Sequence, residues 1–407
     1  NALPHSLKRE EAEEMEKLKQ LALLSAALLC FITAGSAYAQ VDVTIGYLEK
    51  KVPHPPILYN LEEIPEHEGL DGVRLAMKDN ATTGKFLKHN YTLEEVIVGE
   101  EEDAVSAARG LLTKTKLLVI KAPASDLLAI ADLPEAADAV LINAGSADVA
   151  LRNDACRANV LHTLPSRDML ADALAQFSLS KKWNTWALIS GTMDGDKSFE
   201  DALEKSAAKF GLIIVGKKEW AFDADMRRNA AQEVPLFTQD FDDHDLLIVA
   251  DEIGDFGRYV IYNTWLPRPV AGSEGLVASG WSPSVEANGA VQLQNRFRDA
   301  AGRGMTSVDY AAWAGVRAFG EAVTRLNNSD PQAIRAYLLS SEFELAAFKG
   351  APLSFRDWSG QMRQPIPLSH PRALAALAPL AGFLHERTPL DTLGLDKPES
   401  KCTRFGG

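Results

Sequence analysis

Residues 246–259, LLIVADEIGDFGRY, restrict the possible folds of this chain more than any other stretch. The five apolar residues at 246–250 predict a strand that is buried on both faces. Asp251 and Glu252 follow this strand, and two nearby glycines interrupt the backbone. A buried parallel strand that ends in acidic residues and a glycine turn is where open α/β sheets bind ligands. Alternatively, the two acids cap the next helix, an interpretation that suits Glu252 better than Asp251.

Strand and helix patterns alternate in two series along the chain. Strands are predicted at 43–48, 91–98, 117–123, 139–148 and 160–168 in the first series, and at 185–191, 212–222 and 246–252 in the second. Helices are predicted between them, including 70–80, 100–114, 167–181, 194–211 and 227–237. This order predicts an α/β fold with parallel sheets and right-handed crossovers. Two such series predict two lobes, with a cleft between two sets of strand ends.

The last third of the chain is predicted to complete both lobes. Helical patterns occur at 288–302, 308–326 and 330–341, and residues 350–369 alternate like a hairpin whose turn is Trp358-Ser359-Gly360. The predicted division places 40–164 plus 283–345 in lobe 1, 165–282 plus 346–395 in lobe 2, and 396–407 in a C-terminal tail.

The N-terminal segment has the pattern of an export signal. Lys17 and Lys19 precede an apolar run at 21–32, and Ala37-Tyr38-Ala39 forms a cleavage site before Gln40. Residues 1–14 stand upstream of a natural-looking start at Met15. No later run is long enough to span a membrane, so we expect a Sec-exported chain in the periplasm. The formal net charge of −14 gives no sign of a nucleic-acid-binding surface, which needs a basic patch.

Export changes the interpretation of the cysteines. Removal of Cys30 with the signal peptide leaves Cys156 and Cys402, an even pair in an oxidising compartment. A disulfide between them is therefore predicted, and it would tie the tail to the first lobe. The alternative is that Cys156 is a nucleophile.

The usual catalytic motifs are missing from the sequence. Residues 191–198, GTMDGDKS, resemble a phosphate loop, but Asp196 stands where the second glycine is needed. There is no G-x-S-x-G elbow, H-E-x-x-H helix or paired C-x-x-C. The acid-rich segment 240–245 favours a solvated loop over a metal site. The chain is therefore predicted to be no enzyme, with no required metal or cofactor.

Several residues at predicted strand ends are candidate ligand contacts. Lys121 ends a buried strand, where it either extends its ammonium to solvent or contacts an anion. The Gly145-Ser146 turn offers N–H groups and a hydroxyl to a carboxylate. His162 is interpreted as a hydrogen-bonded core residue rather than a ligand contact. Trp281 stands between Gly280 and Ser282 without periodic apolar partners, which favours a role as a platform for a flat ligand.

The whole mature chain resembles a known family. The exported two-lobe pattern is similar to the type I periplasmic solute-binding proteins of ABC importers, in the branched-chain amino-acid receptor group. Blocks such as LHTLPSRDMLADALAQ, VADEIGDFGRY, LPRPVAGSEGLVASGW, MTSVDYAAW, FKGAPLSFRDW and DTLGLDKPESKC resemble the subfamily associated with PQQ-dependent alcohol dehydrogenase systems. The resemblance implies two Rossmann-like lobes joined by hinge crossovers. It also implies pyrroloquinoline quinone (PQQ) or a related anion as ligand, an ABC permease as partner, and a monomer.

The resemblance also implies a set of ligand contacts in the turns after the strands. These turns contain Ser146, Arg167, Thr192, Asp251, Glu252 and Trp281. In an amino-acid receptor, an acid of the second lobe binds the ligand's ammonium, a role open to Asp251 or Glu252. PQQ instead needs cations for its carboxylates, which Lys121, Arg167 and Arg258 could supply. It also needs an aromatic surface, which Trp281 or Tyr310 could supply. Lys121 departs from the subfamily pattern, in which an acid is commoner.

Other functions remain open at this stage. The same fold serves receptors for amino acids or other solutes, and sensors that dock on a membrane kinase. A third alternative is a protein that hands PQQ to an apo-dehydrogenase.

Overall fold

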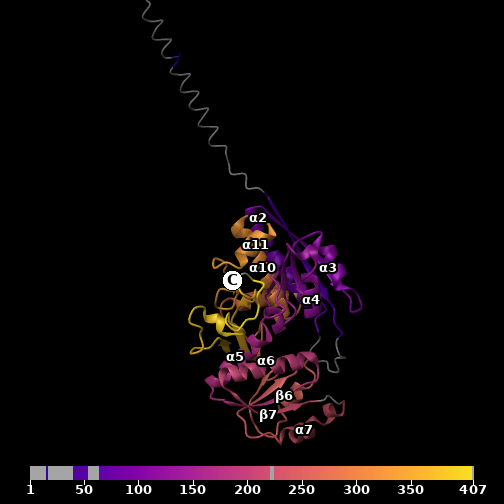
Figure 1. The fold of residues 1–407 in the computed structure, drawn as a ribbon, viewed down its shortest axis with the longest axis vertical. Coiled ribbons are helices and arrows are strands. Elements are labelled where there is room, and N and C mark those ends of the chain that lie inside the picture. The colour runs from indigo at the N-terminus through magenta and orange to yellow at the C-terminus, as the bar shows by residue number, and fades with distance from the viewer. Residues whose placement is uncertain (1–14, 17–39, 54–63, 221–223, 406–407) are drawn as a thin grey trace, which may run out of the picture. The chain divides into compact units, whose positions relative to one another are not determined.

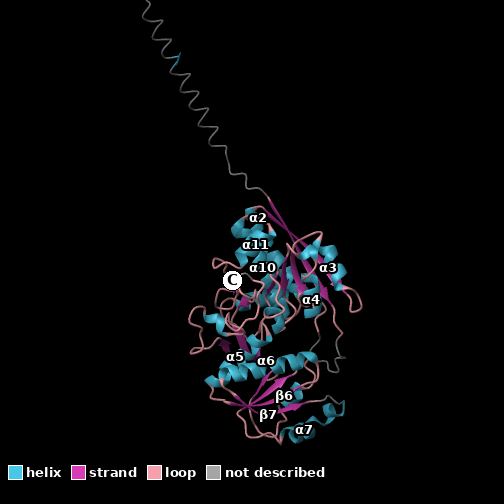
Figure 2. Ribbon diagram, viewed as in Figure 1, coloured by secondary structure: helices cyan, strands magenta, loops and turns pink. Residues whose placement is uncertain are grey.

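The computed structural model describes residues 15–16, 40–53, 64–220 and 224–405. By its internal contacts the chain divides into Asn1–Val41 and Asp42–Gly407. The predicted signal peptide and its cleavage site lie outside the described residues, apart from Met15 and Glu16. None of the helices in the described part is both long enough and apolar enough to cross a membrane. Figures 1 and 2 show how the helices and strands are arranged.

The first sheet has the strand order β2-β1-β3-β4-β5. Its strands are β1 (Val41–Lys50), β2 (His89–Val98), β3 (Leu117–Lys121), β4 (Val140–Asn143) and β5 (Val160–His162). The pairs β1–β3, β3–β4 and β4–β5 are parallel, as predicted. The side chains at 117–120 and 140–143 are all buried, which is typical of a parallel sheet covered on both faces.

Helices cover this sheet and begin at residues that the sequence marks. The helices that connect its strands are α2 (Leu70–Leu87), α3 (Ala104–Leu112) and α4 (Ala124–Ala131), and the short helices η1 (Pro134–Ala136) and η2 (Val149–Arg152) follow. Asp103 caps α3, because its carboxylate accepts hydrogen bonds from the backbone N–H groups of Val105 and Ser106. Asp103, the last acid before this helix, therefore stabilises its N-terminus.

Three later helices return to the first sheet, as the sequence predicts. They are α9 (Ala290–Ala301), α10 (Ser307–Leu326) and α11 (Pro331–Leu338). Helix α10 packs along α2, and Figure 1 shows both beside α11. The two helices approach so closely that a Cβ added at Gly72 would lie 2.0 Å from the backbone oxygen of Asp309. Glycine is thus required at this crossing.

The second sheet has the strand order β14-β13-β10-β9-β8-β6-β7. Its strands are β6 (Thr185–Ser190), β7 (Ile213–Glu219), β8 (Leu246–Ala250), β9 (Val270–Gly272), β10 (Leu276–Ala278), β13 (Ile366–His370) and β14 (Ala373–Ala378). The helices that follow its strands are α5 (Arg167–Ser180), α6 (Asp194–Phe210), α7 (Ala224–Thr238) and α8 (Gly257–Val260). The sheet is parallel from β7 to β10, whereas β13 and β14 are antiparallel. The predicted α/β fold with parallel sheets is confirmed, and an antiparallel hairpin extends the edge of the second sheet.

Three connections run between the two sheets, after β5, after β10 and before β13. The last of them contains the hairpin β11 (Ser354–Phe355) and β12 (Met362–Arg363), and the chain then passes through β13 and β14 to η3 (Pro389–Thr392). Gln361 pairs with His162, and its amide donates to the carbonyls of His162 and Leu164. Gln364 donates to the carbonyl of Thr163 at 2.7 Å. Two of the three connections are thus bound side by side. We call the parts built on the first and second sheets lobe 1 and lobe 2; their predicted boundaries stay a prediction.

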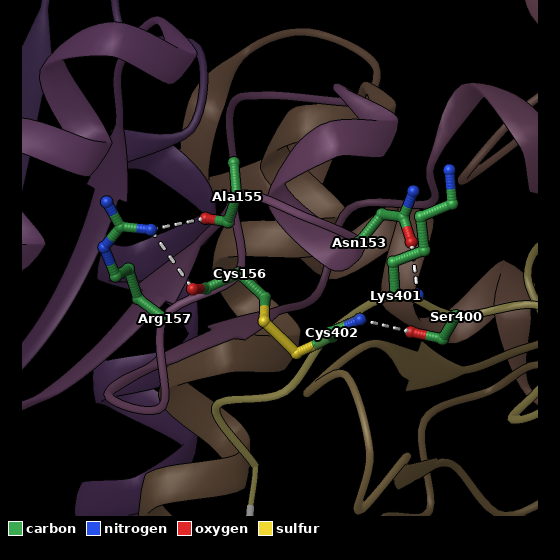
Figure 3. Close-up of a disulfide and its surroundings, with 7 residues drawn as sticks. All are labelled: Asn153, Ala155, Cys156, Arg157, Ser400, Lys401 and Cys402. Atoms are coloured by element: carbon green, nitrogen blue, oxygen red, sulfur yellow. Dashed lines mark hydrogen bonds between the residues drawn. A yellow bond between two sulfur atoms is a disulfide. The ribbon is translucent and has the colours of Figure 1, made fainter.

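The predicted disulfide is present and joins Cys156 to Cys402, whose Cα atoms lie 5.7 Å apart. Figure 3 shows the C-terminal segment lying against the segment after η2. There the backbone N–H of Lys401 donates to the side chain of Asn153 at 2.6 Å. Cys156 is 1 % exposed and disulfide-bonded, so it is a structural cysteine buried in lobe 1.

Candidate ligand-binding site

Arg167 occupies the junction between the two sets of strand ends. It is the first residue of α5, where Ser166 caps the helix by accepting from the N–H of Met169. Its Nε and Nη2 donate to the two carboxylate oxygens of Glu252, each at 2.7 Å. Its Nη1 donates to Oδ1 of Asp148 at 2.9 Å. The guanidinium, whose side chain is 12 % exposed, is therefore shared by an acid that follows β4 and an acid that follows β8.

The charges at this junction hold Arg167 in its cationic form. Burial alone would lower its pKa, but the hydrogen bonds and negative charges of Glu252 and Asp148 raise it. Asp196, at the start of α6, accepts a hydrogen bond from the N–H of Glu252 at 2.7 Å. Burial, with the nearby charges of Asp251 and Glu252, raises the pKa of Asp196 to about 6. The surroundings of Arg167 are thus rich in acids.

The two acids after β8 have different roles, and the one that receives the backbone N–H groups is Asp251, which the sequence favoured less for capping than Glu252. Asp251 is 2 % exposed and accepts from the backbone N–H groups of Asp255, Phe256 and Gly257 at 2.7–2.9 Å. Its carboxylate therefore closes the turn that leads into α8 and accepts from the first N–H of that helix. Glu252 points instead to Arg167. Of the two acids, Glu252 is thus the one at the junction.

The turn after β4 is closed by its own residues. Oδ1 of Asn143 accepts from the N–H groups of Gly145 and Ser146, at 3.2 and 2.9 Å. The hydroxyl of Ser146 donates to Asp148 at 3.2 Å. The donors that the sequence offered to a ligand carboxylate thus have protein partners. His162 beside them is fully buried, and its Nδ1 lies 3.0 Å from Nδ2 of Asn143, which makes it a core residue.

Lys121 lies in an ion-pair cluster that neither sequence interpretation included. Its Nζ is 3.4 Å from a carboxylate oxygen of Glu49 and 3.1 Å from one of Glu68. Glu49 is 1 % exposed and also pairs with Lys51 at 2.7 Å. Tyr47 donates to Glu49 at 3.1 Å, and burial together with Glu49 raises the pKa of Tyr47 well above its usual value. These carboxylates thus balance the positive charge of Lys121 in this structure. Contact between Lys121 and a ligand anion stays a prediction.

Trp281 and Tyr310 form a stacked pair, with ring centroids 4.6 Å apart and planes 10° from parallel. They are 4 % and 1 % exposed, and the hydroxyl of Tyr310 donates to the carbonyl of Ala347 at 2.7 Å. Within the described ranges, Nε1 of Trp281 has no hydrogen-bond partner. Trp313, which is 1 % exposed, packs beside Tyr310 in the core. Both rings are thus buried in this structure, and the role of Trp281 and Tyr310 as ligand contacts stays a prediction.

Thr192 and Arg258 are the remaining predicted contacts, and their contact with a ligand stays a prediction. Thr192 is exposed before α6. Arg258 in α8 donates to the hydroxyl of Tyr259 at 2.8 Å and lies over its ring. The structure thus brings together Asp148, Arg167 and Glu252. In the part of the chain that is described, no group of three or more His, Cys, Asp or Glu residues is placed to bind a metal ion.

The sequence identified candidate residues at the strand ends but not the acids that pair with them. Asp148, Glu49 and Glu68 were not among the candidates, although Asp148 follows the predicted Ser146 by only two residues. An acid directly after a candidate turn was the available signal for Asp148. Glu49 and Glu68 stand far from Lys121 in the sequence, and nothing local indicates that they pair with it.

Comparison with known proteins gives one sequence match and many structural ones. Residues 66–232 match the model of a family described as periplasmic binding protein. No curated protein matches the chain. A branched chain amino acid ABC transporter periplasmic ligand-binding protein from Burkholderia xenovorans LB400 has a TM-score of 0.69 at 16% identity, over 89% of this chain and 99% of that one.

Two further solved structures show the same fold. A solute binding protein of an ABC transporter from R. palustris, in complex with benzoate, has a TM-score of 0.62 at 12% identity, over 89% of this chain and 99% of that one. A leucine-, isoleucine-, valine-, threonine- and alanine-binding protein from Brucella ovis, in a closed conformation, has a TM-score of 0.62 at 12% identity, over 80% of this chain and 89% of that one. The matched family and these neighbours are solute-binding proteins, not enzymes. The chain has the fold of the type I periplasmic binding proteins, and its residues 66–232 carry that family's sequence pattern.

Proposed function

We propose that the protein is the periplasmic solute-binding component of an ABC importer. In this proposal it binds a small planar anion, PQQ or a related molecule, between the lobes and presents the closed form to a permease. The neighbours that bind amino acids or benzoate support a small ligand with a carboxylate. Export by the N-terminal signal, with cleavage after Ala39, belongs to the same proposal.

The observation that carries the proposal is the position of Arg167 between Asp148 and Glu252. A guanidinium binds a carboxylate through two parallel hydrogen bonds, as Arg167 already does with Glu252. The third donor group points to the opposite set of strand ends, where it contacts Asp148. A ligand carboxylate that replaces Asp148 would keep the same ion-pair geometry. The Trp281–Tyr310 pair would contribute the aromatic surface for a planar ligand.

The acids around Arg167 favour a second candidate, a zwitterionic amino acid. Asp148 and Glu252 flank a single guanidinium, so the junction presents one cation and two anions. An amino acid could pair its carboxylate with Arg167 and its ammonium with Asp148 or Glu252. A tricarboxylate such as PQQ would have to compete with both acids for one cation.

Calorimetric titration of the mature protein separates the two candidates. PQQ, benzoate and leucine are the three probes, and each is tested on the wild type, Arg167→Lys and Arg167→Ala. Removing a buried charged partner costs about 2–5 kcal/mol, so Arg167→Ala should weaken binding by roughly 30-fold or more. Arg167→Lys, which keeps the charge but not the two parallel bonds, should fall between. Equal affinities in all three proteins would remove Arg167 from the site.

A further measurement addresses the biological role. An importer component should support uptake of its ligand only when the permease is present. A sensor would signal through a membrane kinase without uptake, and a handover protein would activate an apo-dehydrogenase with no transporter at all.

A further inference from the structure

A cavity apart from the Arg167 junction lies between the segment after α11 and the C-terminal segment that follows β14. It has a volume of about 740 Å³, within the range of small-molecule sites. Its apolar walls come from residues that include Phe343, Pro352, Phe355, Leu377 and Leu390. Neither Arg167 nor Trp281 lines it. We call it the hinge cavity, because the segments that form it precede and follow the β12–β13 connection between the sheets.

Lys349 lies in the wall of the hinge cavity and is 3 % exposed. Its Nζ donates to Oε1 of Gln364 at 2.6 Å and to the carbonyl of Pro365 at 3.2 Å. It also lies 4.6 Å from the centroid of the Tyr310 ring. Among the described residues, no carboxylate forms an ion pair with it. Burial lowers its pKa well below the usual value, as expected for an ammonium without a counter-ion.

Other buried cations in this region do have a carboxylate. Arg356 and Arg363 share Asp391, at 2.9 and 2.8 Å, although all three side chains are largely buried. A buried charge without such a partner destabilises a protein by several kcal/mol in general. Lys349 therefore has hydrogen-bond acceptors but, among the described residues, no negative charge paired with it.

The charged residues of the lining limit which ligand the cavity suits. The two acids of the lining, Glu344 and Asp357, are exposed, whereas Lys349 is buried. Leu384, also in the lining, is 54 % exposed and adds apolar surface. The exposed acids repel additional negative charge, so the ligand that suits the cavity has a single carboxylate for Lys349 and an apolar body for the apolar walls.

We propose that the hinge cavity binds an amphipathic monocarboxylate, whose carboxylate pairs with Lys349 and whose apolar part packs against Phe343, Phe355 and Leu377. The cavity joins both lobes, since Phe343 follows α11 of lobe 1 and Leu377 belongs to β14 of lobe 2. Lys349 also connects through Gln364 to the carbonyl of Thr163 in the first crossover. Occupation of the cavity is therefore linked to the relative position of the lobes.

Calorimetry with decanoate tests the proposal on the mature, oxidised protein. Decanoate should bind, and decanol, which has the same chain without the charge, should bind at least tenfold more weakly. Lys349→Met keeps the length of the side chain and removes the ammonium, so it should weaken decanoate binding at least tenfold. Arg167→Ala, which alters the other junction, should leave decanoate binding unchanged.

A second pair of variants keeps the test valid should Lys349→Met fold poorly. Ala351→Trp fills the cavity from a half-buried lining position and should also weaken decanoate binding at least tenfold. Ala287→Trp, at an exposed position outside the lining, is its control and should bind like the wild type. The proposal is overturned if decanoate does not bind at millimolar concentration, or if Ala351→Trp binds it as well as the wild type. Loss of decanoate binding in Arg167→Ala alone would place the ligand at the other junction and overturn it equally.

Discussion

Nη1 of Arg167 lies 2.9 Å from Oδ1 of Asp148, and this ion pair connects lobe 2 to lobe 1. The same guanidinium is held by Glu252 within lobe 2. The side chain of Arg167 is thus held to its own lobe by two hydrogen bonds and to the other lobe by one, and its backbone N–H also donates to the carbonyl of Ala147 in that other lobe at 3.0 Å. The ion pair with Asp148 is the side-chain contact of Arg167 that crosses between the lobes.

Asp148→Asn should shift the ligand-free protein toward open conformations. Asp148 is 38 % exposed, so solvent screens the pair and its contribution is about 0.5–1 kcal/mol. The ratio of closed to open protein should therefore fall roughly two- to fivefold. Small-angle X-ray scattering should show a larger radius of gyration, and added salt should reduce the difference from the wild type. Glu252→Gln breaks the contact inside lobe 2 and is the control; an equal expansion in that variant would contradict this role of Asp148.

Loss of the disulfide should destabilise the protein strongly. Cys156 and Cys402 are 246 residues apart in the sequence, and closing so long a loop restricts the unfolded chain by up to about 5 kcal/mol. The double variant Cys156→Ala/Cys402→Ala should unfold at a lower urea concentration than the oxidised wild type. Reducing agent should lower the wild-type midpoint and leave that of the double variant unchanged. Equal midpoints for oxidised and reduced wild type would refute the prediction.

Asp168→Asn should stabilise the protein at neutral pH. Asp168 is 6 % exposed, its Oδ1 has no hydrogen-bond partner among the described residues, and burial raises its pKa to about 6. The folded state therefore holds a proton more tightly than the unfolded state, in which the pKa is about 3.9. Its contribution to stability is full below about pH 4 and is lost as the pH rises through about 6.

The pH dependence provides the check on Asp168. A shift of roughly two pKa units corresponds to at most about 3 kcal/mol. The gain in unfolding free energy from Asp168→Asn should approach that limit at pH 8 and shrink toward pH 4. Urea titrations of both proteins at several pH values measure it. A gain that does not vary with pH would show that the carboxylate of Asp168 is not the cause.

Two glycine-to-alanine changes should act in opposite directions. At Gly72 the new Cβ would lie 2.0 Å from the backbone oxygen of Asp309, so α2 and α10 must move apart, which costs about 1–3 kcal/mol or more. At Gly110 in α3 no atom lies within 4 Å of the new Cβ, and alanine should stabilise the helix by about 0.5–1 kcal/mol. Urea midpoints compare the pair. If Gly72→Ala has the same urea midpoint as the wild type, α2 and α10 are not as closely packed as this contact requires.

Much of the fold could be predicted because its signals are local. Five consecutive apolar residues at 246–250 became β8, since a strand buried on both faces needs only apolar side chains. Helix α6 ends at Gly211, whose φ of 71° is the left-handed conformation that favours glycine at a helix end. Such residues specify their own conformation.

The details of the site depended on signals that are not local. Asp251 and Glu252 are adjacent and chemically alike, and only the turn at 251–257 decides which carboxylate receives the N–H groups. Lys121 and Glu49 meet because β1 and β3 are neighbours in the sheet, which the spacing of 72 residues does not reveal. Lys349 lies in a loop with no periodic pattern, so its burial followed only from the packing of distant segments.

The amides of Gln361 and Gln364 have one more consequence. Together they donate hydrogen bonds to the carbonyls of His162, Thr163 and Leu164. Two of the three crossovers between the lobes are therefore bonded to each other along their length. Neither crossover can slide past the other without breaking several buried hydrogen bonds at once. We therefore expect the lobes to rotate about a single axis through these two crossovers rather than to translate. The amide protons of these crossovers should be among the slowest of the chain to exchange with solvent.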